Sequence, residues 1–184
     1  MTAPDTKKTM TLRDFSGICG KKGISVMTIT DDPGMPIQIN NFRGPHWFLS
    51  NFSPSRIIGA YGIVYKTAEA AFQAGKTDDP VKRQRIADAR SPYQAKGLGR
   101  QLKLPDDWRV RRNGTMRAVL EYKFANAELL RKLLDTRHAI LVEGNVWHDN
   151  YWGNCICSKP SCTAPGENWL GRLLMEVRDG RRRG

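Results

Sequence analysis

The amino-acid sequence predicts an α+β domain that is mostly helical and carries a small sheet. Helix-start signals and helical apolar periodicity fill most of the chain after residue 66, whereas only a few short apolar runs between turn residues suit strands. The chain has 184 residues, enough for one domain with its own core. Hydrophobic residues make up 40% of it and include five tryptophans, so a packed domain is expected.

The sequence divides into three parts. Residues 1–36 hold several glycines and prolines without sustained periodicity, which predicts a mobile N-terminal extension. Residues 37–179 are the predicted domain. Residues 180–184 form a short basic tail that contains Arg181, Arg182 and Arg183.

Three segments are expected to form strands. Ile37 to Phe42 is a short apolar run, and Ile57 to Lys66 predicts a hairpin that turns around Gly59–Gly62. Ala139 to Glu143 is a second short apolar strand.

Helices are expected where a capping residue precedes a helical pattern. They cover Thr67 to Lys76 with Thr67 as the N-cap, a second helix opened by Asp79-Pro80, a third opened by Ser91-Pro92, Asp106 to Asp135 with a break at Asn126, and Trp169 to Val177 after Gly166 or Asn168.

Charge and targeting signals narrow the function classes. The net charge is +12, and positions 82–117 hold eleven Lys or Arg against three Asp, a local net charge of +8. This excess predicts contact with a polyanion, most simply nucleic acid. The chain shows no secretory signal and no apolar run of the roughly 20 residues that cross a bilayer. A soluble cytoplasmic protein with no membrane partner is expected.

The segment from Thr67 to Lys76 is the richest in chemistry. Glu69, Gln73 and Lys76 fall at i, i+4 and i+7, so they share one face of the predicted helix. One interpretation is a solvated face with a glutamate that favours the helix N-terminus. The other is a pocket wall in which Glu69 is an acid or base and Lys76 supplies an amine.

A glycine-punctuated loop after the last predicted strand carries Glu143, Asp149 and Trp152. Taken singly, Asp149 suits an Asx turn and Trp152 a place in the core. Together with Glu69, Asp149 would complete the pair of carboxylates that glycosyl chemistry commonly uses.

The run Gly97-Leu-Gly99-Arg100 has two interpretations. It resembles a nest of backbone N–H groups beside a cation, which would suit a phosphate. The glycines are equally typical of a helix C-cap.

The four cysteines are Cys19, Cys155, Cys157 and Cys162, of which the last three are clustered. A zinc site would need a fourth ligand such as Cys19 or His148, and the spacing matches no standard finger. His46, His138 and His148 show no ligand spacing. Reduced thiols are therefore expected, with no metal and no cofactor.

A series of motifs follows in order from about Asn40 to Arg178. They include Leu49-Ser-Asn-Phe52, Thr67-x-Glu69-x-x-Phe72-Gln73-Ala74-x-Lys76, Ala95-x-x-Leu98-Gly99-Arg100, Trp108, Met116, Lys123-Phe124, Asp149-x-Tyr151-Trp152-Gly153 and Gly166-x-Asn168-x-Leu170-Gly171. Together these motifs resemble the NADAR family, named for a predicted link to NAD and ADP-ribose.

The resemblance implies a compact α+β fold and an N-glycosidase. Such proteins remove ADP-ribose from modified guanine in nucleic acid or nucleotides, or hydrolyse ribosylamine intermediates of riboflavin synthesis. The basic region favours the first substrate; a non-catalytic ADP-ribose-binding module is the third alternative. The implied catalytic residues are Glu69, Lys76 and Asp149. The implied substrate contacts are Asn51, Phe52, Gln73, Gly99, Arg100, Trp108, Trp152 and Asn168.

This sequence departs from the family pattern at two places. Ala70 stands where the family commonly has His after the glutamate. Asn154 to Pro165 is an apparent insertion that brings the cysteine cluster. We expect this insertion to reshape the rim of the pocket.

Overall fold

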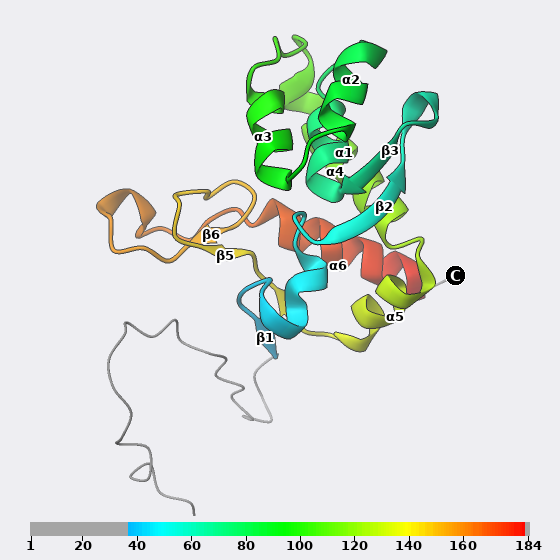
Figure 1. The fold of residues 1–184 in the computed structure, drawn as a ribbon. Coiled ribbons are helices and arrows are strands. Elements are labelled where there is room, and N and C mark those ends of the chain that lie inside the picture. Colours follow the sequence, from blue (N-terminus) through cyan, green and yellow to red (C-terminus); the bar gives the residue numbers. More distant parts are fainter. Residues whose placement is uncertain (1–36, 183–184) are drawn as a thin grey trace, which may run out of the picture.

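Six α-helices and three two-stranded sheets make up residues 37–182, the part of the protein that the computed structural model describes (Figure 1). The predicted α+β class, mostly helical, is confirmed. The strands do not form one small sheet but three separate two-stranded sheets. The predicted extension, residues 1–36, lies outside the described residues. No helix within residues 37–182 is long and apolar enough to cross a membrane.

The hairpin is the longest strand pair. β2 (Pro54–Ile58) runs antiparallel to β3 (Val64–Thr67), and the short 3-10 turn Ala60–Gly62 joins them. Gly62 has φ +69°, a conformation that glycine adopts without strain. The hairpin prediction is confirmed, although β2 begins three residues before Ile57.

The other strands are only two residues long. The predicted strands 37–42 and 139–143 shrink to β1 (Gln38–Ile39) and β4 (Ile140–Leu141), which pair in parallel. β5 (Gly144–Asn145) and β6 (Asn154–Cys155) form a further parallel pair that was not predicted. A strand of two residues is too short to show the alternation of apolar and polar residues by which strands are predicted.

The capping residues predicted for the first three helices are confirmed. Thr67 Oγ1 accepts from Ala70 N at the start of α1 (Ala68–Ala74). Asp79 caps α2 (Pro80–Ala87), and Ser91 caps α3 (Pro92–Arg100).

The later helices follow the predicted pattern with one change in length. α4 (Trp108–Lys123) and α5 (Ala127–Asp135) are separated at Asn126, whose side chain caps α5. α6 (Trp169–Arg182) begins where expected but continues beyond Val177. Residues 180–182 of the predicted basic tail therefore belong to this helix.

Helix α1 lies at the centre of the domain. All seven of its residues are buried. It packs against α2, α3, α4 and the hairpin, while α6 covers α4 and β4 (Figure 1). Polar side chains on α1 must therefore find their partners inside the protein or in a cavity.

Close packing of α1 on α3 explains Gly99. The residue is helical, and a Cβ built on it would lie 2.8 Å from the Cβ of Gln73, far closer than such atoms approach. The only described glycines with positive φ are Gly44 and Gly62, so residues 97–99 do not form the left-handed turn of a nest. The C-cap of α3 is Gln101. Both sequence interpretations of Gly97 and Gly99 are therefore wrong.

Lys123 is completely buried near the end of α4. Its Nζ donates to Ser50 O at 2.7 Å and to Ser53 Oγ at 2.9 Å, which ties α4 to the segment that precedes the hairpin. Burial lowers the pKa of Lys123 to about 7, because a charged ammonium loses its hydration there. The neutral amine is thus the form that the fold favours above that pH.

This burial predicts a specific pH dependence of stability. In the unfolded chain Lys123 keeps its proton up to its ordinary pKa of 10.5, whereas the folded protein releases it above about 7. The unfolded state therefore binds more protons in this window, and stability rises with pH. Between pH 7 and 9, the free energy of unfolding of the wild type should rise by roughly 2 kcal/mol more than that of Lys123→Met.

Chemical denaturation at several pH values measures this difference. Lys132→Met, at an exposed position on α5, is the control and should follow the wild type. Parallel stability curves for the wild type and Lys123→Met would contradict the assignment.

Candidate active site

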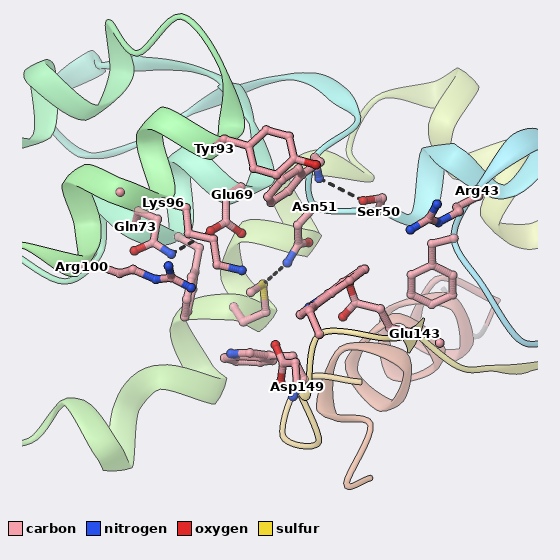
Figure 2. A pocket seen from close by; sticks show the side chains of 18 of the residues that line it. Arg43, Ser50, Asn51, Glu69, Gln73, Tyr93, Lys96, Arg100, Glu143 and Asp149 are labelled. Atoms are coloured by element: carbon pink, nitrogen blue, oxygen red, sulfur yellow. Dashed lines mark hydrogen bonds between the residues drawn. The ribbon is translucent and has the colours of Figure 1, made fainter. Parts of the chain in front are cut away.

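A pocket of about 900 Å³ opens between α1 and α3 on one side and the loop that follows β4 on the other (Figure 2). Its floor includes Met116 from α4, and the segment between β1 and β2 adds Asn51 and Phe52. Figure 2 shows Glu69, Gln73, Lys96 and Arg100 on one wall, with Glu143 and Asp149 across the pocket.

The wall from α1 carries the predicted column. Gln73 Nε2 donates to Glu69 Oε1 at 2.7 Å, and the two residues are only 4% and 6% exposed. The interpretation of a solvated helix face is therefore wrong. The helix ends at Ala74, so Lys76 follows the C-cap Gly75 and is not helical. Its side chain nevertheless lines the same pocket.

Burial shifts Glu69 and Lys76 in opposite directions. Desolvation raises the pKa of the Glu69 carboxyl, and it prevails over the hydrogen bond from Gln73 and the nearby lysines and Arg100, which lower it. Desolvation also lowers the pKa of Lys76, helped by the like charges of Arg100 and Lys96 and opposed by Glu69. Burial thus disfavours the charged form of both residues.

The wall from α3 presents a stripe of three side chains, of which only Arg100 was predicted from the sequence. Tyr93, Lys96 and Arg100 fall at i, i+3 and i+7 and all line the pocket. The Tyr93 ring meets the ring of Phe52 edge-on, with centroids 4.9 Å apart. Their helical spacing places these side chains on one face of α3, but the sequence does not show that this face lines a pocket. Two cations here suit an anionic group of a ligand.

The opposite wall contains Asp149 and Trp152, as predicted. Asp149 Oδ1 accepts from Tyr151 N at 3.2 Å and from Trp152 N at 2.9 Å. Trp152 packs edge-on against Phe72 with ring centroids 5.2 Å apart. Both alternatives from the sequence therefore hold: the residues stabilise the turn and the core, and both line the pocket.

Glu143 is a third carboxyl at the pocket that was not among the predicted catalytic residues. Desolvation, followed by repulsion from Asp149 and Glu69, raises its pKa to about 7. The sequence could have indicated Glu143 as a site residue, because it lies in the same predicted loop as Asp149. Glu143 therefore adds to the pocket a carboxyl that is partly protonated near pH 7.

The remaining predicted contacts separate into two groups. Asn51, Phe52 and Arg100 line the pocket. Among the described residues Asn51 Oδ1 has no hydrogen-bond partner, while Asn51 Nδ2 contacts Met116 Sδ at 3.5 Å. A residue that lines the pocket thus keeps a buried amide oxygen without a partner.

Trp108, Gly99 and Asn168 lie outside the pocket lining. Trp108 is 7% exposed and packs on Phe72, so it supports the wall from behind. Asn168 Oδ1 accepts from Glu143 N at 3.0 Å, and Asn168 Nδ2 donates to Leu141 O at 2.8 Å. It therefore positions Glu143 and is not placed to meet a ligand.

The chain is similar to known proteins over most of its length. The model of the NADAR domain matches residues 40–181. The N-glycosidase YbiA of Shigella flexneri serotype 5b is 38% identical over 133 residues, which cover 71% of this chain and 78% of that protein. The chloroplastic riboflavin biosynthesis protein PYRR of Zea mays is 35% identical over 147 residues, which cover 70% of this chain but 22% of that longer protein.

The fold is also shared with a solved structure. The NMR structure of the Escherichia coli protein YbiA superimposes with a TM-score of 0.67 at 34% identity, and the match covers 80% of this chain and 87% of that one. The similarity therefore extends over nearly the whole described domain.

The position of Glu143 leads to a direct prediction. Its carboxyl should titrate in the folded protein with a midpoint near 7, because charging it leaves a poorly solvated anion beside Asp149 and Glu69. Carbon-detected NMR of glutamate side chains measures the midpoint, and Glu143→Gln assigns the signal by removing it. Glu128 serves as the internal reference, because its bond to Lys132 lowers its pKa. A midpoint near the ordinary 4.5 for Glu143 would contradict the buried, repelled carboxyl.

Proposed function

The chain belongs to the NADAR family, and from that premise we propose that its pocket hydrolyses the N-glycosidic bond that joins C1 of a ribose to an exocyclic amine. Its similarity to proteins named N-glycosidases supports a hydrolase acting on N-glycosyl bonds. The substrate that we propose is ADP-ribose attached to guanine, in nucleic acid or in a nucleotide.

The observation that carries the proposal is the buried column of Glu69 and Gln73 beside Lys76. Gln73 fixes one carboxylate oxygen of Glu69, which leaves Glu69 Oε2 free of that bond. A carboxyl with a raised pKa keeps its proton to higher pH, which suits it to donate that proton to a leaving amine. A lysine with a lowered pKa supplies a neutral amine more readily than an exposed one.

These groups suit a route through a Schiff base. Ring opening breaks the bond between C1 and the ring oxygen of the ribose and gives an imine between C1 and the exocyclic nitrogen. The Lys76 amine adds to C1, and the base leaves with a proton from Glu69. Water then adds to the resulting lysine imine, and the sugar departs as an aldehyde that closes to ribose. Lys76 and Glu69 return to their starting states.

A carboxylate-only route is the alternative. Protonation of the departing amine by one carboxyl would give an oxocarbenium ion, and a second carboxylate would activate water. Asp149 and Glu143 are available for that second role. Asp149 Oδ1 already accepts two backbone N–H bonds, so Glu143 is the less committed base.

The charge and size of the pocket favour a diphosphate-containing substrate. Arg43, Lys96 and Arg100 line it, and they offer cations to phosphate oxygens. A volume of about 900 Å³ has room for ADP-ribose together with a base. Trp47, Trp147 and Trp152 offer indole faces on which a base can stack.

A ribosylamine intermediate of riboflavin synthesis is the second candidate. The specific support is the similarity to the maize protein PYRR and to the Vibrio vulnificus riboflavin biosynthesis protein VVA0006, of which this chain covers 22% and 35%. A third candidate, a non-catalytic ADP-ribose-binding module, does not require an acid and an amine side by side.

Two substrates distinguish these candidates. The purified protein is incubated with an oligonucleotide that carries one ADP-ribosylated guanine, and separately with a ribosylamine pyrimidine monophosphate. We expect mass spectrometry to find free ADP-ribose and unmodified oligonucleotide in the first reaction, with the higher kcat/KM. Faster cleavage of the pyrimidine would favour the second candidate. Binding of ADP-ribose without cleavage of either substrate would support the third candidate, the non-catalytic binding module.

Substitutions separate the roles of Glu69 and Lys76. Glu69→Gln keeps the side-chain shape but removes proton transfer, which should lower kcat by about 10²–10⁴. ADP-ribose should bind with nearly unchanged affinity, because the loss falls on the transition state. Lys76→Arg should be as damaging if the amine attacks C1, since a guanidinium stays protonated. Borohydride should trap a sugar adduct in the wild type and not in Lys76→Arg.

Matched controls come from the exposed pair on α5. Glu128→Gln and Lys132→Arg make the same chemical changes outside the pocket and should leave kcat unchanged. An active Lys76→Arg, together with a wild type that borohydride cannot trap, would leave only the carboxylate route.

Contact with nucleic acid through positions 82–117 predicts a salt effect. If these lysines and arginines meet phosphates, kcat/KM on the oligonucleotide should fall steeply with salt, with a log–log slope of several units. The same reaction on an ADP-ribosylated guanine mononucleotide should show a much flatter dependence. Equal slopes for the two substrates would contradict a nucleic-acid groove.

A further inference from the structure

We propose that His148, Cys155, Cys157 and Cys162 form a binding site for one zinc ion, which holds the pocket-forming loop in place. The prediction of metal-free thiols depends on the lack of a fourth ligand in the cysteine spacing. The structure brings His148 beside the three cysteines, although it is seven residues from the nearest of them in the sequence.

The four ligand atoms gather in one small volume. His148 Nδ1 lies 3.3 Å from Cys162 Sγ, 3.3 Å from Cys157 Sγ and 3.8 Å from Cys155 Sγ. All four atoms lie within 4.8 Å of one another. Bonds of about 2.3 Å to sulfur and about 2.0 Å to nitrogen place the corners of a zinc tetrahedron roughly 3.5–3.8 Å apart. The observed spacing is close to that of a single tetrahedral ion.

The backbone around the cysteines is organised by specific contacts. Cys155 ends β6, and its N–H donates to Asn150 Oδ1 at 2.8 Å. Ile156 N donates to Asn145 O at 2.8 Å, which holds the chain between Cys155 and Cys157 against β5. Cys162 lies in the short 3-10 turn Pro160–Cys162. Three separate local structures therefore direct their thiols to one point.

The donor set selects the kind of ion. Thiolates and imidazole are soft or borderline ligands that favour zinc over magnesium or calcium. Four protein ligands fill the tetrahedron and leave no position for water or substrate, which is typical of a structural site. Zinc would thus stabilise the loop without entering the chemistry of cleavage.

Zinc at this site would also affect the pocket, because one of its ligands is next to a pocket residue in the sequence. His148 precedes Asp149 directly, and the turn that Asp149 forms carries Trp152. Fixing His148 to the cysteines therefore fixes one wall of the pocket. This effect on cleavage depends on the proposed function, whereas the binding of zinc itself does not.

The metal content of the purified full-length chain tests the site independently of activity. We expect roughly one zinc per chain by plasma mass spectrometry, and a thiol count that rises by three when a chelator removes the metal. Replacement by Co²⁺ should give the intense visible bands of a tetrahedral thiolate complex. A chain without zinc that also fails to take up zinc or Co²⁺ under reducing conditions would overturn the proposal.

Single substitutions identify the ligands. Cys157→Ser, Cys162→Ser and His148→Ala should each lower zinc to well below one per chain. Ser161→Ala, beside Cys162, and Cys19→Ser, at the fourth cysteine of the chain, should keep the full amount. Loss of zinc in Cys19→Ser with retention in His148→Ala would overturn the assignment of His148. Because wild-type metal content and Co²⁺ spectra need no variant, an unfolded variant leaves the test intact.

Discussion

The hydrogen bond from Gln73 to Glu69 inside the buried helix α1 is the interaction on which the site depends. A helix whose residues are all buried exposes little of a carboxylate to bulk water, so its polar groups must pair or face a cavity. The amide holds one oxygen of Glu69, and the pocket receives the rest of that carboxyl group. Gly99 makes this possible, because any side chain there would collide with Gln73. Burial then raises the pKa of Glu69 and lowers that of Lys76.

Local signals in the sequence predicted most of the helices and one strand pair. Four helices are capped by a side-chain oxygen that accepts from backbone N–H groups of the first turn, which have no partner within the helix. The capping residues are Thr67, Asp79, Ser91 and Asn126. The pairing of β5 with β6 could not be predicted, since two-residue ladders depend on contacts made elsewhere. The candidate site likewise has residues that local sequence signals reveal and residues whose place depends on distant contacts. Helical spacing indicated Glu69, Gln73 and Lys76, although Lys76 lies just beyond the end of α1. Which face of α3 lines the pocket depends on packing.

The wall that carries Glu143, Asp149 and Trp152 is built differently from the helical wall. It is a loop held by amide side chains: Asn168 binds the backbone at Glu143, and Asn145 Nδ2 donates to Asp149 O at 2.7 Å. The cluster of His148 with three cysteines lies directly beside Asp149 in this loop. Contacts between residues distant in the sequence join Glu143 to Asn168 and His148 to Cys162, so the sequence alone showed the members without their arrangement.

A crystal structure of Glu69→Gln with bound ADP-ribose tests the central claim most directly, because this variant should bind the ligand without turning it over. The account predicts C1 of the terminal ribose between residue 69 and Lys76, with the diphosphate toward Lys96 and Arg100. A ligand bound outside this pocket, or inside it with C1 turned away from both residues, would contradict the assignment of the active site.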